Sequence, residues 1–144
     1  MNGKTDHSTI EQLESRIVQY VERRTEISSA FLFGSAGSEN EHRESDVDIA
    51  VLFAMNVQPG GFSLPQMRQE LSDLLLRDVD LVNLNTAPVV LRMQVLRKGQ
   101  KVFDRNPRQT DRFVIRTMCE YDDLKRSRKP IEKQLLRGRI YGRP

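Results

Sequence analysis

The chain has 144 residues, 38% hydrophobic and 30% charged, which suits one α/β domain with a core and much exposed surface. No apolar run approaches the roughly 18 residues of a membrane span, and the first residues lack the pattern of a signal segment. The net charge of +3 divides into −7 over residues 1–90 and +10 over residues 91–144, which indicates an anionic partner or substrate for the basic part.

The first half of the chain predicts a helix followed by two strands. Residues 1–7 are polar and are expected to be disordered. Residues 8–11 match a capping box, and apolar residues then recur at helical spacing, which predicts an amphipathic helix to about Arg24. Two β-prone runs, residues 27–33 and 46–53, predict strands on either side of a polar segment.

The second half predicts further helices and strands after a loop that contains Pro-Gly-Gly. These elements are a helix from residue 63 or 64, a strand over 78–84, a helix over 89–98, an edge strand over 100–103 and a helix from 107. Pro130 is expected to restart a last helix through residue 136. Together these elements predict a single α/β domain of residues 1–144: a small mixed sheet with helices mainly on one side, and a basic helical region, residues 105–144, that contacts a partner.

Two hydrophobic features of the C-terminal region carry further expectations. Phe113, either Ile115 or Val114, Met118, Tyr121 and Leu124 recur at helical spacing and are predicted to share one face. Cys119 is the only cysteine, so an internal disulfide is excluded and a reducing cytoplasm is expected. We expect Cys119 to be a small buried apolar residue.

The polar segment between the first two strands carries the chemistry. Gly34 and Ser35 follow the first strand, where a glycine allows a sharp exit and close approach by a ligand. If a helix starts there, the Ser35 hydroxyl and free backbone amides can bind phosphate oxygens. Asp46 and Asp48 stand two residues apart at the head of the second strand, so their side chains share a face.

Two neighbouring carboxylates repel each other unless a cation lies between them. Hard oxygen ligands of this kind favour magnesium or manganese. A phosphate-binding turn that faces a divalent metal is what phosphoryl or nucleotidyl transfer requires. The alternative is an ordinary loop with solvated acids.

The pattern Gly-Ser, ten residues, Asp-x-Asp, with apolar strands on both sides, resembles the signature of minimal nucleotidyltransferases of the polymerase-beta-like superfamily. The resemblance implies the polymerase-beta-like fold and a third acid on a neighbouring strand, a place that Asp80 matches and for which Asp78 is the rival. Asp46, Asp48 and Asp80 would then hold two magnesium ions, and manganese is an alternative.

The same resemblance implies a nucleotide site. Gly34 and Ser35 would bind the phosphates of ATP, and Ser45 is a further candidate whose ordinary role is a surface hydroxyl. Family members commonly carry Arg-Ala-Arg-Gly after Gly-Ser, whereas this chain has Ala-Gly-Ser-Glu over residues 36–39. Neutralising the triphosphate charge would therefore fall to Arg43 or to a basic residue of the C-terminal region.

The C-terminal sequence resembles a narrower group, the MntA-type antitoxins that are paired with HEPN-family ribonuclease toxins. Tyr121-Asp122-Asp123-Leu124 and residues 128–132 and 138–143 carry this resemblance. It implies transfer of AMP from ATP to a tyrosine of the toxin, in a cytoplasmic complex of the two proteins. Direct nucleic-acid binding is disfavoured, because Tyr141 is the only aromatic residue available for stacking in the basic tail.

Two alternatives stay open from the sequence. One is the same chemistry on a small molecule such as an aminoglycoside, although the chain has no second domain to build that cleft. The other is a non-enzymatic antitoxin that blocks its toxin by occlusion, which the retained acids disfavour.

Overall fold

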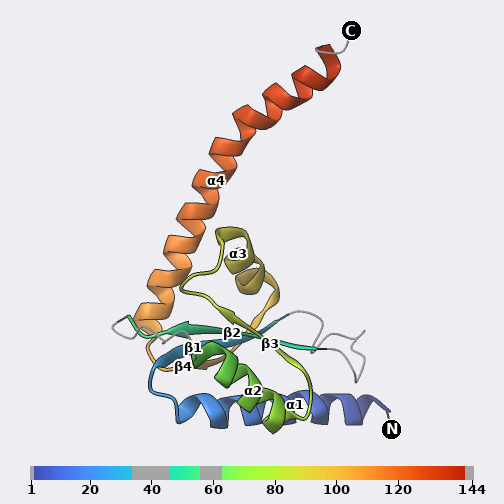
Figure 1. Ribbon diagram of the computed structural model, residues 1–144, viewed down its shortest axis with the longest axis vertical. Helices are drawn as coiled ribbons and strands as arrows, with labels where there is room; N and C mark the ends of the chain where they lie inside the picture. Colours follow the sequence, from blue (N-terminus) through green and yellow to red (C-terminus); the bar gives the residue numbers. More distant parts are fainter. Residues whose placement is uncertain (1, 34–45, 56–62, 142–144) are drawn as a thin grey trace.

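The computed structural model describes residues 2–33, 46–55 and 63–141, with side chains for 10–33, 46–55 and 64–127. These segments form four helices and four strands in the order α1-β1-β2-α2-β3-α3-β4-α4 (Figure 1). Their bounds are α1 Asn2–Glu22, β1 Ile27–Phe33, β2 Val47–Phe53, α2 Ser63–Leu75, β3 Val79–Asn83, α3 Val89–Lys98, β4 Gln100–Asp104 and α4 Pro107–Tyr141. The sheet order is β3-β2-β1-β4, with β2 and β3 parallel and the other two pairs antiparallel. The predicted mixed sheet flanked by helices is confirmed.

The helices divide between the two faces of the sheet: α1 and α2 cover one face, and α3 and α4 lie on the other (Figure 1). In β2, Val47 and Ile49 are buried on the α1–α2 side, whereas Ala50 and Leu52 belong to the cluster on the α3–α4 side. The prediction of helices mainly on one side is wrong, because β2 is apolar on both faces and each face needs a cover.

Most bounds agree with the sequence prediction to within one residue, but α1 does not. The helix begins at Asn2, so residues 2–7 are helical rather than disordered, and the capping box at residues 8–11 lies inside it. A capping residue favours a helix start, yet a helix can pass through it when no proline blocks the preceding turn. Local capping chemistry alone therefore misplaced the start of α1.

The longest helix, α4, also corrects the prediction. It runs without a break from Pro107 to Tyr141, through Pro130, where a new helix was expected. A proline removes one amide donor and can kink a helix without ending it. Met118 is 53% exposed and so does not share the buried face of Phe113, and Cys119 is exposed rather than buried, so both predictions are wrong. The buried face of α4 includes polar side chains that a search for apolar spacing does not detect; they are Gln109, Thr110 and Thr117.

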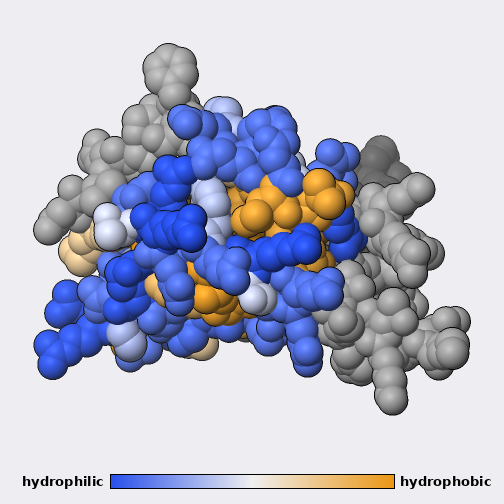
Figure 2. Space-filling model, turned by 90° about the horizontal axis from the view of Figure 1, so that it is seen from below, coloured by the Kyte–Doolittle hydropathy of each residue, from blue (hydrophilic) through white to orange (hydrophobic). Residues whose placement is uncertain are grey.

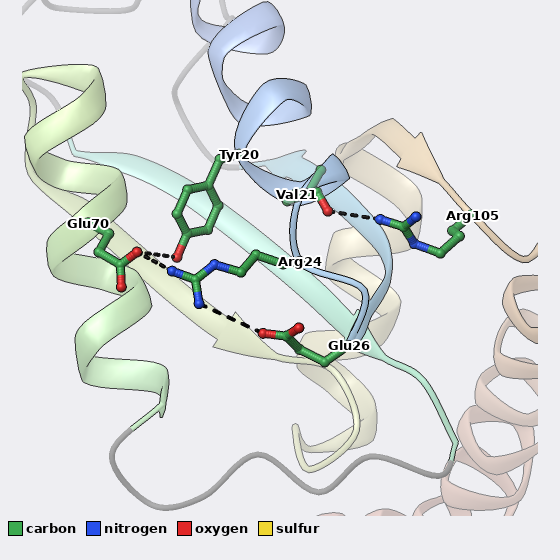
Figure 3. Close-up of polar contacts among 6 residues, drawn as sticks. All are labelled: Tyr20, Val21, Arg24, Glu26, Glu70 and Arg105. Carbon is green, nitrogen blue, oxygen red and sulfur yellow. Dashed lines mark hydrogen bonds and ion pairs between the residues drawn. The ribbon is translucent and has the colours of Figure 1, made fainter.

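Polar side chains tie α1 to the rest of the fold (Figure 3). The Arg105 guanidinium donates to the carbonyls of Val21 at 3.0 Å and Glu22 at 3.1 Å in the last turn of the helix, and the Val21 carbonyl also accepts from the Arg24 amide at 3.1 Å. On the other side of α1, Tyr20 donates its hydroxyl to Glu70 of α2 at 3.2 Å, and Arg24 pairs with the same carboxylate. Burial raises the pKa of Tyr20 to about 12, so its hydroxyl remains a donor at neutral pH.

The surface formed by α1 and α2 is mostly hydrophilic, with apolar patches between the polar side chains (Figure 2). Leu74 of α2, which is 39% exposed, contributes to the apolar part of the described surface. None of the helices in the described segments is both long enough and apolar enough to cross a membrane.

Candidate active site

Two of the three predicted acids face each other across neighbouring strands. Asp48 of β2 and Asp80 of β3 are register partners in the parallel pair, and Asp46 comes one residue before β2. Val47 and Ile49 point into the core beneath α1 and α2, so Asp48 points to the opposite face of the sheet. Asp46 and Asp80 are exposed and Asp48 is half-buried. The fold therefore brings the three acids together on one face of the sheet, at the edge where β2 and β3 begin.

The charges of these acids act on one another. Burial raises the pKa of Asp48 above its usual range, and the neighbouring charges of Asp80 and Asp46 raise it further. Within the segments that the structure describes, no basic side chain forms an ion pair with any of the three. The folded chain thus carries negative charge at this edge that a bound cation would neutralise.

Two hydrogen bonds hold the start of β3, and one of them involves Ser72, a residue that the sequence did not single out. The Ser72 hydroxyl of α2 accepts a hydrogen bond from the Val79 amide at 3.1 Å, and the Asp78 carbonyl accepts one from the Val47 amide at 2.8 Å. These two bonds fix the register that sets Asp80 opposite Asp48. Ser72 carries no motif in the sequence, since its role depends on the packing of α2 against β3. Asp78, the rival for the third acid, precedes β3, and its backbone carbonyl forms the second of these bonds.

The end of β1 lies beside the acids. Phe33, the last residue of β1, is the register partner of Asp48. Gly99, after α3, lies against it: an added Cβ there would be 3.2 Å from the Phe33 Cβ and 2.4 Å from the Val95 carbonyl oxygen. Gly34, Ser35 and Ser45 themselves lie outside the described residues, so their nucleotide-binding roles remain predictions, as does that of Arg43.

The acids fit a hard divalent cation by chemistry and by register, but they are not yet gathered around one. As the described side chains stand, no three Asp, Glu, His or Cys residues form a group that could hold a metal. Carboxylate oxygens are the ligands that magnesium and manganese prefer. Cation binding would require the side chains of Asp46, Asp48 and Asp80 to turn toward one another, a change that the mutual repulsion of their charges opposes and that the attraction of each carboxylate to the cation would drive.

Comparison with known proteins identifies the fold family. The family model described as "Polymerase beta, Nucleotidyltransferase" matches residues 15–108. The chain belongs to this nucleotidyltransferase family. Its relatives include the protein adenylyltransferase MntA of Shewanella oneidensis, to which it is 35% identical over 101 residues, 70% of each chain. The family match begins within α1, covers the sheet, α2 and α3, and ends at the start of α4.

Solved structures with the same fold extend the similarity to α4. A toxin–antitoxin structure with AMP-PNP matches with a TM-score of 0.72 and 30% identity, over 85% of this chain and 98% of the other. A tri-AMPylated Shewanella oneidensis HEPN toxin in complex with its MNT antitoxin contains a chain that matches with a TM-score of 0.70 and 28% identity, over 88% and 98%. The predicted relationship to antitoxin nucleotidyltransferases is confirmed.

Proposed function

We propose that this chain is a magnesium-dependent adenylyltransferase that transfers AMP from ATP to a tyrosine hydroxyl of a HEPN-family toxin, and so silences the toxin in the cytoplasm. The observation that carries the proposal is the pairing of Asp48 with Asp80, beside Asp46, on one face of the sheet. The similarity to a protein adenylyltransferase and to antitoxins solved with a HEPN toxin supports the choice of substrate.

In the proposed reaction, the tyrosine oxygen attacks the α-phosphorus of ATP, and the bond from that phosphorus to the pyrophosphate oxygen breaks. Asp46 and Asp48 would hold the metals on the triphosphate, and Asp80 would orient the hydroxyl and accept its proton. Gly34, Ser35 and Ser45 would bind the phosphates. When bound, two magnesium ions supply charge that lowers the pKa of the attacking hydroxyl and stabilises the leaving pyrophosphate.

The proposal also assigns the parts of the chain. Residues 1–144 act as one nucleotidyltransferase domain, and residues 105–144 contact the partner. Region 105–144 lies almost entirely beyond the part that the family model matches, which supports a role specific to this branch of the family.

The decisive test is intact-mass spectrometry of the neighbouring gene's product, co-expressed with this chain. We expect a gain of one or more AMP units with the parent chain and none with the Asp46→Asn/Asp48→Asn variant. A complex that forms without any mass gain would favour occlusion of the toxin. Transfer of AMP to an antibiotic, with no gain on the protein, would favour the small-molecule alternative.

Metal binding makes a separate prediction about stability. Because the folded state raises the pKa of Asp48, the folded chain binds that proton more tightly than the unfolded chain, and its stability falls as the pH rises through this range. Asp48→Asn should therefore raise the melting temperature of the metal-free protein at neutral pH. Millimolar magnesium should raise the melting temperature of the parent and have less effect on the variant.

Thermal unfolding in EDTA and in magnesium chloride measures both effects, and Asp78→Asn serves as the matched control. Asp78→Asn should keep the magnesium response of the parent. If magnesium stabilises parent and Asp48→Asn chains equally, the ion acts elsewhere and the metal site is misplaced.

A further inference from the structure

The longest helix leaves the body of the protein beside α3. Arg92 of α3 donates to the Thr117 hydroxyl at 3.3 Å and pairs with Glu120, which fixes the first half of α4 against α3. Beyond Tyr121 the helix projects away from the sheet and from the other helices (Figure 1). At 1.5 Å per residue, residues 122–141 extend for about 30 Å. A helix owes most of its stability to tertiary packing, so a projecting segment of this length indicates that something packs against it.

The inner angle between α3 and the projecting part of α4 has a distinct chemistry, and we call it the elbow: Arg97, Tyr121, Leu124 and Lys125. The Tyr121 ring lies between two cations, with the Arg97 guanidinium carbon at 5.1 Å and the Lys125 ammonium nitrogen at 5.1 Å from its centre. Tyr121 and Leu124 are half-buried, whereas Arg97 and Lys125 are exposed.

The cations of the elbow have no carboxylate partner in the described part of the chain. Of the described acids nearby in the sequence, Glu120 pairs with Arg92, Asp122 pairs with Arg126 at 3.2 Å, and Asp123 forms no ion pair with either cation of the elbow. Two uncompensated cations around an aromatic ring, next to a leucine, form a surface complementary to a carboxylate beside an apolar side chain. Tyrosine and arginine are also the residues that most often dominate the energy of protein interfaces.

The position of the elbow connects it to the candidate active site. α3 and α4 lie on the face of the sheet toward which Asp48 and Asp80 point. A different row of cations runs along α4: Arg108, Arg112 and Arg116 are exposed at successive four-residue steps. Arg108 and Arg112 come nine and five residues before Thr117, which contacts α3, so they lie on the outward face of the helix, whereas Arg116 comes one turn before Glu120. A protein bound in the elbow would lie over the face that carries the acids, whereas one bound to the outward arginines would lie on the far side of α4.

We propose that the elbow is the docking surface for the partner protein, which binds it through an acidic surface that also presents an apolar side chain. The inference rests on the proposed function for the existence of that partner. Beyond that function, the inference specifies which face of α4 contacts the partner, and it specifies the chemistry of the partner's surface.

The test measures the affinity of the neighbouring gene's purified product for variants of the full chain, all carrying Asp46→Asn/Asp48→Asn. Working in this inactive background ensures that a loss of binding cannot come from a loss of AMP transfer. Arg97→Glu/Lys125→Glu should raise Kd at least about tenfold, because opposite charges across the contact become like charges. Tyr121→Ala should weaken binding as well, while Tyr121→Phe keeps the ring and should retain most of the affinity.

Arg108→Glu/Arg112→Glu is the matched control, since it makes the same change of charge on the outward face of the same helix. We expect its Kd to stay within about threefold of the parent value. Loss of binding by the control alone, or by both variants equally, would overturn the elbow as the docking surface. Thermal unfolding of each variant shows whether a loss of binding comes from lost contacts or from unfolding.

If the complex depends on the elbow but the parent chain adds no AMP, the proposed chemistry is wrong and the docking surface stands. If the inactive background variant does not bind the product at all, the elbow as a docking surface is overturned.

Discussion

Asp80→Asn should lower the rate of AMP transfer by about a hundredfold to ten-thousandfold, the range that a positioned acid–base group contributes. The substitution keeps the size of the side chain and its place opposite Asp48, but it removes the negative charge and the proton acceptor. The exposure of Asp80 means that the fold should not suffer from this change. Single-turnover transfer of labelled AMP to the purified partner protein measures the effect.

Asp78→Asn is the control for this prediction, because it changes the same residue type two positions away. Asp78 contributes its carbonyl to the Val47 amide, and the substitution leaves that backbone bond in place. We expect transfer within about threefold of the parent rate, in line with the small effect of most surface substitutions. If Asp78→Asn lost the activity and Asp80→Asn kept it, the third acid would be assigned to the wrong residue.

The bounds of the elements nearest the site could be predicted from the sequence, because the local sequence patterns and the tertiary packing favour the same bounds. Gly99 ends α3 where the helical spacing ends, and the structure leaves no room for a side chain there, since the Val95 carbonyl would lie 2.4 Å from its Cβ. β1 was predicted with its observed bounds because its apolar run, residues 30–33, is what a strand covered on both faces requires, and Ile27 extends it. The same reasoning placed Asp46 and Asp48 at the head of β2.

Other features needed tertiary information. The register of Asp48 with Asp80 depends on a parallel pairing that α2 connects, and on the Ser72 hydroxyl that holds the Val79 amide. The residues that form the buried face of α4 also depend on tertiary contacts, so the sequence did not predict them correctly. Gln109 is buried because its amide donates to the Phe53 carbonyl at 2.8 Å, so a polar residue took a place that hydrophobic spacing could not predict.

The end of β2 makes the strongest prediction about stability. Phe53 is fully buried between the sheet and the helices α1 and α2. Its backbone is held as well, since the Phe53 amide donates to the Asn85 side chain at 2.8 Å and its carbonyl accepts from Asn85 and Gln109. These bonds prevent β2 from moving inward to fill a cavity. Phe53→Ala should therefore lower the free energy of unfolding by about 3–5 kcal/mol.

Denaturant unfolding of the metal-free chain measures this loss, and Leu76→Ala provides the control. Leu76 is 82% exposed, so its truncation should change the free energy of unfolding by no more than about 0.5 kcal/mol. Phe53 lies at the opposite end of β2 from Asp48, so the folded fraction of Phe53→Ala should transfer AMP at the parent rate. A loss of stability below about 1 kcal/mol would mean that β2 relaxes into the cavity despite the bonds to Asn85 and Gln109.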